Sequence, residues 1–388
     1  MRTWFLLLFV LLGGCASVER RPDPPPTALF DDAAFPPPTQ AVDAADLFTL
    51  SPAMKAHLHS AAFKSKLQQR GAAQGLVMAL YDKSDLLLDY EAKATLTAAQ
   101  TYAARAGNCL SLVIMTAAFA RELNMRIRYQ SVESDEVWSR ADSLYLVSGH
   151  VNISLAPPKP RIDLYDHSTE LVVDFMPSVD AARLHTRELE ESDIVALYMN
   201  NRAAEELVQG RTANAYWWVR AALTLRPSTL TAYNTLAVVY QRSGRPLLAE
   251  RVYRLALERE PDSLIVMQNL APLLAANGKT AEAEAMTQRL ARLYPAPPYH
   301  YFDQGVLAYR AGDFTRARTL FAREVARAPY NDEFHFWLGL SNYQLGELGA
   351  AEKQLALARE HSVHSERRER YAAKLSHLRG IAAGMRRN

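Results

Sequence analysis

Cys109 stands where a cysteine side chain is well placed to become a nucleophile. It follows Gly107-Asn108, a pair typical of turns, and begins an almost wholly apolar run that extends to Leu123. A run that is apolar on nearly every side predicts a helix buried in the core. The first turn of a helix has unpaired N–H groups and a partial positive charge, which favour thiolate over thiol. The alternative is that Cys109 packs as a small hydrophobic residue, the usual role of a free cysteine.

A thiol that attacks an acyl group needs a base within hydrogen-bonding reach and a group that orients the base. Residues 149–155 alternate polar and apolar side chains, which predicts a strand with His150 on its more polar face. Residues 170–176 form a short apolar run that Asp174 interrupts, and a carboxylate there is costly to bury without a partner. A histidine on the adjacent strand would be such a partner. Taken alone, His150 fits a core histidine and Asp174 a strand-end residue that bonds a turn.

The start of the chain predicts export to a bacterial envelope. The apolar run 4–12 follows a positively charged start and is too short to span a membrane, so we expect residues 1–14 to be a signal peptide. Leu12-Gly13-Gly14-Cys15 resembles the lipobox of bacterial lipoproteins, which implies a diacylglycerol on the Cys15 sulfur. Ala16, rather than aspartate, follows the cysteine, and the resemblance then implies the periplasmic face of the outer membrane.

The segment after the lipobox is rich in proline. Residues 15–40 are therefore expected to form an extended, semi-stiff tether between the lipid and the folded domains. The chain has two cysteines. With Cys15 committed to lipid, Cys109 has no partner for a disulfide in an oxidising compartment, so it is either deeply buried or used.

Composition limits the classes of function. The chain has 388 residues, of which 49% are hydrophobic and 22% charged, as in a soluble globular protein of two or more domains. A net charge of +2 gives no electrostatic argument for nucleic acid as a partner, so that class is set aside. The sequence has no His-x-x-x-His or paired-cysteine spacing, so no metal site is expected. The chemistry of a thiol and an imidazole needs no cofactor.

The order cysteine, histidine, aspartate resembles the transglutaminase-like fold, an α+β architecture related to papain. In that family Gly-x-Cys begins the buried helix, which ends in Arg-x-x-Gly before a basic strand. Here Gly107-Asn108-Cys109 leads to Arg121 and then Asn124, which replaces the glycine and also tolerates the left-handed conformation. Val173-Asp174 matches the family's Val-Asp, although Phe175-Met176 separate it from Pro177. The resemblance covers residues 75–180, within a domain expected over 41–190 together with its N-terminal helices.

The resemblance implies a role for each residue. Cys109 would be the thiolate nucleophile, His150 the general base and then acid, and Asp174 the group that orients the imidazole. The backbone N–H of Cys109 would stabilise the oxyanion, with Trp138 or Tyr102 as a guess for the second donor. Four residues in less strand-like surroundings stay as rivals, namely Asp163 and Asp166 for the carboxylate and His167 and His185 for the imidazole.

The second half of the chain repeats itself every 34 residues. Four columns keep this interval: Pro227, Pro261, Pro295 and Pro329; Gly210, Gly244, Gly278, Gly312 and Gly346; Ala215, Ala249, Ala283, Ala317 and Ala351; and the small residues Ala203, Ala237, Ala271, Gly305 and Gly339. The pattern resembles the tetratricopeptide repeat, a helix–turn–helix unit, with five units over 194–363. Pro272, inside the first helix of the third unit, predicts a kink or a shortened turn. Residues 364–388 are expected to be a capping helix and tail.

Stacked repeats of this kind form a concave groove that commonly binds a peptide or another protein. The positions that would face the groove by the family's register are Asn234, Gln241, Arg242, Tyr299, Phe302, Tyr309, Phe336 and Tyr343. Aromatic residues at helical spacing pack between repeats more often than they contact a ligand.

Together these patterns predict a lipid-anchored envelope protein with an α+β thiol domain and an all-α repeat solenoid. The thiol domain would act on peptide or amide bonds, forming a thioester on Cys109 that water or an amine resolves. The solenoid would bind the substrate or a partner protein. The alternative is a catalytically inactive transglutaminase-like scaffold in an envelope assembly.

Overall fold

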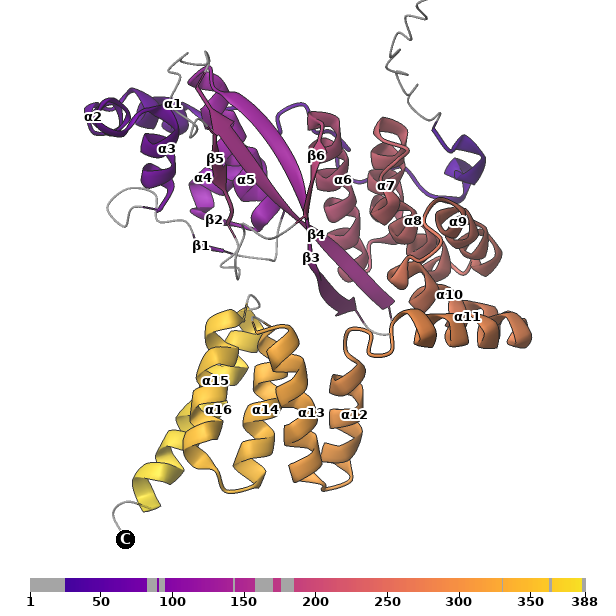
Figure 1. The fold of residues 1–388 in the computed structure, drawn as a ribbon. Coiled ribbons are helices and arrows are strands. Elements are labelled where there is room, and N and C mark those ends of the chain that lie inside the picture. Colours follow the sequence, from indigo (N-terminus) through magenta and orange to yellow (C-terminus); the bar gives the residue numbers. More distant parts are fainter. Residues whose placement is uncertain are drawn as a thin grey trace, which may run out of the picture.

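The computed structural model describes residues 25–81, 89–90, 95–141, 144–157, 170–175, 185–329, 331–362 and 365–385. The expected signal peptide at 1–14, the lipidation candidate Cys15 and the rivals Asp163, Asp166 and His167 lie outside the described residues. Within them, a helical N-terminal part leads into an antiparallel sheet, and a series of helix pairs follows (Figure 1).

The first three α-helices of the described residues are short: α1 (Pro52–His59), α2 (Ala61–Arg70) and α3 (Ala72–Tyr81). Ser51 caps α1, because its side chain accepts a hydrogen bond from the Met54 N–H at 3.3 Å and Pro52 occupies the first helical position. The Ser51-Pro52 pair therefore starts a helix.

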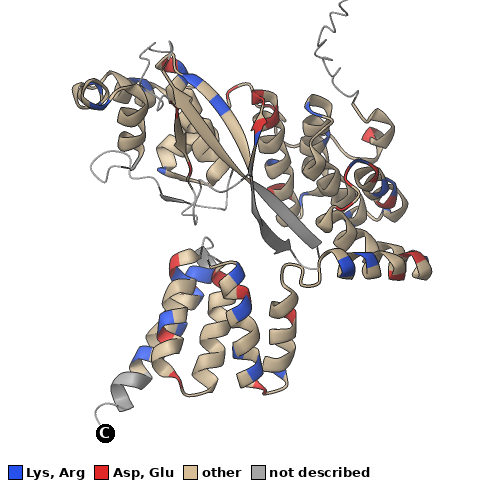
Figure 2. Cartoon of the chain, viewed as in Figure 1, with Lys and Arg blue, Asp and Glu red and all other residues tan. Residues whose placement is uncertain are grey.

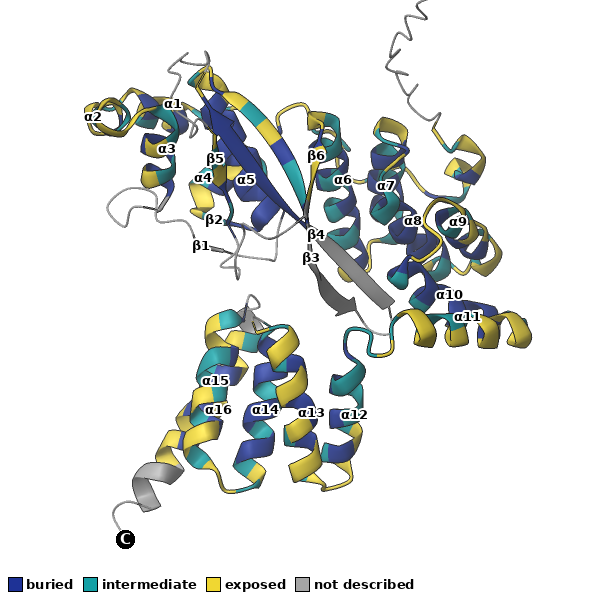
Figure 3. Ribbon diagram, viewed as in Figure 1, coloured by how far each residue is buried: buried dark blue, intermediate teal, exposed yellow. Residues whose placement is uncertain are grey.

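The sheet has four antiparallel strands in the order β5-β4-β3-β6. Its strands are β3 (Arg126–Ala141), β4 (Leu144–Ala156), β5 (Leu171–Val173) and β6 (His185–Leu189). The helices α4 (Ala98–Ala104) and α5 (Cys109–Glu122) precede it, and a small parallel pair joins β1 (Asp89–Tyr90) to β2 (Ala106–Gly107). Helix α5 packs against β3 and β4, and every residue from Cys109 to Ala120 is buried (Figure 3).

The central strand β4 differs in one respect from the expected alternation. His150, Asn152 and Ser154 share one face, yet their side chains are as buried as those of Val151 and Ile153 on the other. A strand with neighbours on both edges and elements packed on both faces buries even its polar side chains. The face that carries His150 is therefore polar but covered.

Five helix pairs follow the sheet in the described residues. They are α6 (Glu191–Val208) with α7 (Thr212–Leu225), α8 (Leu230–Arg242) with α9 (Pro246–Arg259), α10 (Leu264–Ala276) with α11 (Thr280–Leu293), α12 (His300–Arg310) with α13 (Phe314–Arg327), and α14 (Asp332–Gln344) with α15 (Leu348–His361), before a last helix α16 (Ser365–Met385). The glycine of each turn has a φ between 71° and 79°, the left-handed conformation that the column predicts. In the second pair, for example, the Arg245 N–H then donates to the Tyr240 carbonyl at 2.9 Å and closes the helix end.

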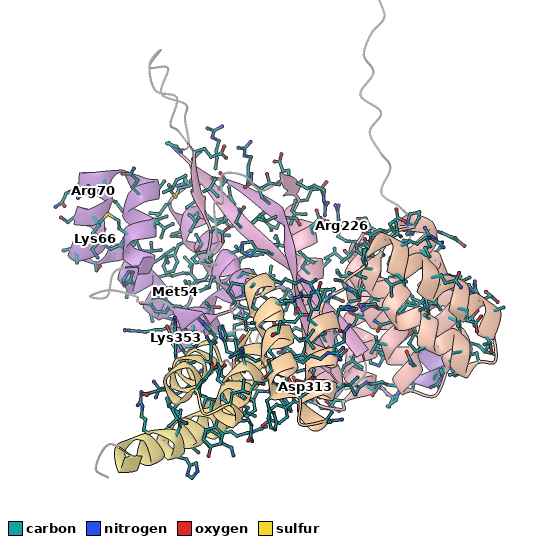
Figure 4. All side chains as sticks on the ribbon, turned by 60° about the horizontal axis from the view of Figure 1, so that its bottom comes forward. Met54, Lys66, Arg70, Arg226, Asp313 and Lys353 are labelled. Atoms are coloured by element: carbon teal, nitrogen blue, oxygen red, sulfur yellow. The ribbon has the colours of Figure 1, made fainter. Side chains whose placement is uncertain are left out.

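Side chains also fix the turns between pairs. Arg226, labelled in Figure 4, follows α7 and donates to Asp193 Oδ1 at 2.8 Å and to Glu190 Oε2 at 2.8 Å. These bonds hold the end of α7 against the start of α6. At the other end of the array, α16 buries Tyr371, Leu375 and Leu378, the face expected of a capping helix.

Pro272 does not shorten its helix. Helix α10 runs through Pro272 and spans 13 residues, the same length as α8. The expected shortened turn is therefore absent at this position. Pro272 is exposed, and its ring leaves the carbonyl of Gln268 without the usual N–H partner four residues on.

The array is interrupted after its third pair. Helix α12 begins at His300, two positions later than the 34-residue interval from Leu264 of α10 places it, and Tyr299 before it has a φ of 66°. Pro297-Pro298 disfavours helix at the residues that precede each proline. Within the described residues, no helix before this linker packs extensively against a helix after it.

The described part of the proline-rich stretch is packed rather than extended. Residues 25–39, here called the N-terminal segment, lie against α7, α8 and α9. Phe35 stacks on Tyr216 with ring centroids 4.0 Å apart, and the Tyr240 hydroxyl donates to the Leu29 carbonyl at 2.6 Å. The tether expected over 15–40 therefore ends by Pro25, because Leu29 and Phe35 gain more from burial than from solvent.

Basic and acidic side chains are both present along the repeat helices, whereas α1 to α4 carry no acidic residue (Figure 2). Among the residues that the structure describes, no helix is long and apolar enough to cross a membrane.

Candidate active site

The turn before α5 holds Cys109 at the first helical position. The Asn108 side chain accepts from the Ser111 N–H at 2.9 Å and from the Ser111 hydroxyl at 2.8 Å, which caps the helix. A Cβ on Gly107 would lie 2.8 Å from the Ser111 Cβ, so only glycine fits at that position. Gly107 and Asn108 thus work together to start the helix at the cysteine.

His150 and Asp174 meet on neighbouring strands. His150 Nε2 lies 2.7 Å from Asp174 Oδ1, and the imidazole donates to the carboxylate. The register explains the meeting, since Ile153 of β4 pairs with Val173 of β5. Continued by one residue, it places Asp174 opposite Asn152, two positions from His150 on the same face.

The thiol of Cys109 also influences the imidazole. Burial alone would lower the pKa of His150, but the hydrogen bonds to Asp174 and Cys109, and the negative charges of both groups, raise that pKa to about 9. The second ring nitrogen, Nδ1, is buried and makes no regular hydrogen bond. Because Asp174 engages Nε2, Nδ1 is the nitrogen left to exchange a proton with the thiol.

The three side chains lie deep in the fold. Cys109 is 7% exposed and His150 4%, while the Asp174 side chain is 12% exposed. A low-dielectric setting strengthens the interactions between these groups. It also means that an acyl substrate must reach the sulfur past the side chains that cover it.

The other candidates for the site are placed less closely. The ring of Tyr102 packs in the core against Phe119, with centroids 5.9 Å apart, and against His57. Trp138 belongs to β3 and His185 begins β6, but their side chains lie outside the described ones. The second oxyanion donor stays a prediction. No group of three or more histidine, cysteine, aspartate or glutamate residues suited to a metal occurs among the described residues.

The positions expected to face the repeat groove are mostly committed to packing. Asn234 is buried and accepts a hydrogen bond from Asn269 at 2.8 Å, Gln241 is half-buried and Arg242 is exposed. The five aromatic positions pack between or within repeats: Tyr299 and Phe302 on Phe334, Tyr309 on Trp337, Phe336 on Tyr371, and Tyr343 in the cluster around Leu355. The expectation that they line a ligand groove is wrong for the buried Tyr299 and Phe302, because these rings fill the core of the fourth repeat.

Two residues that no sequence pattern marks, Thr95 and Glu205, lie beside the cysteine turn. The Asn108 amide donates to the Thr95 hydroxyl at 2.9 Å, and the Thr95 N–H donates to Glu205 Oε1 at 2.6 Å. Thr95 is 2% exposed. A buried threonine outside any helix or strand has no periodic signal, and its partner Glu205 lies 110 positions away, so neither could be recognised from local pattern.

The comparison with protein families decides the nature of the helix pairs. The profile of the tetratricopeptide repeat matches residues 234–298, 269–332 and 302–362. The C-terminal half of the chain carries tetratricopeptide repeats. Comparison with curated proteins gives no match.

Solved structures resemble the chain only loosely. PilF of Pseudomonas aeruginosa is 22% identical, covering 50% of this chain and 90% of that chain, with a TM-score of 0.31. TTC0263, a tetratricopeptide repeat protein of Thermus thermophilus, is 20% identical over 46% of this chain and 98% of that chain, with a TM-score of 0.32. PilW, a type IV pilus biogenesis factor, is 20% identical over 47% and 92%, with a TM-score of 0.28. Similarity at this level carries no argument about function.

Proposed function

We propose that this protein is a thiol enzyme that hydrolyses or transfers acyl groups at peptide or amide bonds. The observation that carries the proposal is the 2.7 Å contact between His150 Nε2 and Asp174 Oδ1, with Cys109 acting on the same imidazole from the first turn of α5. A nucleophile, a base and a group that orients the base are the parts that covalent acyl transfer requires. They also match the roles implied by the resemblance of residues 75–180 to the transglutaminase-like fold.

In the proposed reaction the Cys109 thiolate attacks the carbonyl carbon of an amide. The backbone N–H at the start of α5 stabilises the negative oxygen, and His150 gives its proton to the departing amine. A thioester then joins the acyl group to Cys109. Water or a second amine, deprotonated by the neutral imidazole, attacks the thioester and returns the thiol, which gives hydrolysis or transfer respectively.

The repeats supply the binding function in this proposal. Stacked helix pairs offer an extended concave surface, and tetratricopeptide repeats typically bind peptides or proteins. The solenoid would bring a protein substrate or an assembly partner to the thiol site. The lipobox-like Leu12-Gly13-Gly14-Cys15 supports a lipid-anchored location in the bacterial envelope, on the periplasmic face of the outer membrane.

The burial of the thiol favours a second candidate. With Cys109 and His150 both under a tenth exposed, the region would also suit a scaffold that keeps the arrangement of residues without turning over a substrate. In that case the repeats alone would carry the function, as the binding surface of an envelope assembly.

The reactivity of Cys109 distinguishes the two. In a Cys15→Ser background Cys109 is the single thiol of the chain, and its alkylation by iodoacetamide can be followed between pH 5 and 9. An enzyme predicts fast alkylation already at pH 6, and a loss of at least about tenfold at that pH in His150→Ala, because an ordinary thiol is almost fully protonated there. His185→Ala, the rival histidine, serves as the matched control and is expected to leave the rate unchanged. Slow alkylation at pH 6 that His150→Ala does not alter would leave only the scaffold.

A further inference from the structure

A chain of hydrogen bonds joins the first helix of the repeats to the turn that carries Cys109. Glu205 of α6 accepts from the Thr95 N–H at 2.6 Å, and its carboxylate also bonds the Thr95 hydroxyl. That hydroxyl in turn accepts from the Asn108 amide at 2.9 Å. Asn108 is the N-cap of α5, so Glu205 is two hydrogen bonds away from the residue that precedes Cys109.

A second bond fixes the same turn from the same segment. The Leu96 N–H donates to the Ser111 hydroxyl at 2.8 Å, and that hydroxyl donates to Asn108 Oδ1 at 2.8 Å. Thr95, Asn108 and Ser111 are all at most 9% exposed. Because buried bonds of this kind have little competition from water, the segment 95–96 holds the first turn of α5 at two points.

Glu205 is itself held by the first repeat. Arg202, one turn earlier on α6, donates to Glu205 Oε2 at 2.5 Å, and its guanidinium lies 5.9 Å from the ring of Trp218 on α7. Burial raises the pKa of Glu205 against the opposing effect of its bonds to Thr95 and Arg202. The carboxylate is thus fixed on both oxygens, one toward the repeats and one toward the cysteine turn.

We propose that Glu205 is a positioning residue, through which the first repeat helix sets the position of the Cys109 turn relative to His150. The functional meaning of this coupling rests on the proposed thiol chemistry. A shift of α6, such as a ligand bound along the repeats would impose, then moves Thr95 and Asn108 and changes the distance between sulfur and imidazole. The first repeat and the thiol site behave as one mechanical unit, with Glu205 at the joint.

The test uses the full chain in the Cys15→Ser background and measures the pH profile of Cys109 alkylation. Thr95→Val keeps the backbone N–H but removes the hydroxyl, and Glu205→Ala removes the carboxylate. We expect each to slow alkylation at pH 6 by about tenfold, because small displacements of a reacting group have large effects on rate. Thr95→Ser restores the hydroxyl and should return the rate to within about twofold of the parent.

Glu206→Ala is the matched control. Glu206 is the next residue of α6 and is buried more deeply than Glu205, but it bonds Arg211 and Asn214 instead of Thr95. Its loss should weaken the first repeat without changing the alkylation profile. Glu206→Ala as slow as Glu205→Ala, or Thr95→Val as fast as the parent, would overturn the proposal.

Hydrogen exchange separates this proposal from the proposed function. Amides of residues 109–113 should exchange faster in Thr95→Val and Glu205→Ala, but not in Glu206→Ala, if the bonds hold the turn. If Cys109 of the parent protein is alkylated slowly and His150→Ala does not change the rate, the proposed thiol chemistry is wrong. Hydrogen exchange at residues 109–113 then still tests the positioning role of Glu205. Equal exchange at 109–113 in all three variants would overturn that role on its own.

Discussion

One ring nitrogen of His150 is fixed by the Asp174 carboxylate, and the thiol of Cys109 also acts on the imidazole. Such a ring is stabilised as the charged imidazolium, because both neighbours are negative or can become so. Burial opposes that charge, since a buried ion pair must offset the cost of leaving water. The attraction of the neighbouring groups outweighs burial, so the pKa of His150 is raised to about 9 and the charged ring contributes to the stability of the fold.

Stability should fall as the pH rises through the pKa of His150. The folded pKa of about 9 lies above the ordinary 6.5, so the contribution of the charged ring is complete below pH 6.5 and lost as the pH rises through 9. Asp174→Asn removes the partner and should lower the free energy of unfolding by about 2 kcal/mol at pH 6, and by clearly less at pH 9.5. Urea denaturation of both proteins at pH 6, 7.5 and 9.5 measures the difference.

A second ion pair provides the control for this experiment. Asp193 accepts from Arg226 at 2.8 Å, and an arginine keeps its charge over the whole range. Asp193→Asn should therefore destabilise the protein by a similar amount at every pH. A difference between Asp174→Asn and the parent that stays constant from pH 6 to 9.5 would contradict the assignment of a charged His150.

The residues of the site differ in how well they can be predicted from local sequence. Gly107-Asn108 before an apolar run predicts a capped helix that begins at Cys109, because capping depends only on neighbours in the chain. Asp174 is conspicuous because a charge in an apolar run needs a partner. Thr95 and Glu205 have no comparable sequence signal. Their contact depends on how α6 lies against the cysteine turn, and the packing of the whole chain sets that arrangement.

Among the helices, the small-residue column of the repeats makes a direct prediction about packing. A Cβ on Gly305 of α12 would lie 2.7 Å from Phe321 Cε1 of α13, whereas a Cβ on Gly380 of α16 would meet nothing within 4 Å. Gly305→Ala should destabilise by about 1–2 kcal/mol through overpacking, and Gly380→Ala should stabilise by about 0.5 kcal/mol through helix propensity. Thermal unfolding of the two variants beside the parent tests both signs, and a Gly305→Ala protein at least as stable as the parent would show that Phe321 moves aside freely.

The 34-residue period predicts the helix pairs well and the fate of individual side chains poorly. Every turn glycine has the positive φ that its turn requires, because this requirement depends only on the local backbone. The aromatic residues recur at the same spacing whether they face a groove or a neighbouring helix, so the period could not tell Tyr299 in the core from a ligand contact. The interruption before α12 could be predicted only from Pro297-Pro298, because the repeat columns keep their 34-residue spacing on either side of it.

At the scale of the whole molecule, the proline-rich composition of the N-terminal segment predicts an extended tether, but the segment is packed against the repeats. Proline-rich chain is extended in isolation, yet here Asp32 accepts from Arg220 at 2.7 Å and Pro36 accepts from Trp217 at 2.7 Å, partners more than 180 positions away. These contacts fasten the first described residues to the outside of the early repeats. If Cys15 carries lipid as proposed, the segment 16–24 would be the whole distance between the membrane and the repeats, at most about 35 Å when fully extended.

The linker at 294–299 divides the molecule into two cooperative units. Among the described residues, the apolar cluster before the linker includes Phe35 and ends at Ala283, whereas the clusters around Phe302 and Leu355 lie after it and are joined by the packing of α14 on α13 and α15. Because burial of apolar surface is the main source of cooperativity, the part on each side of the linker should unfold as a unit. Phe35→Ala and Phe302→Ala each remove a buried ring, at a cost of about 3 kcal/mol, but from different units.

Two calorimetric transitions are therefore expected from the full chain, and each variant should lower the melting temperature of one of them. Hydrogen exchange assigns the transitions, since Phe35→Ala should speed exchange in α7 and α8 and leave α12–α15 unchanged, with the reverse for Phe302→Ala. A single transition that both variants lower equally would mean that the linker transmits stability despite the separate apolar clusters. Two independent transitions would imply that the packing across the linker transmits no conformational change. A ligand bound to α12–α15 would then affect Glu205 and the thiol only if it also contacted the earlier repeats.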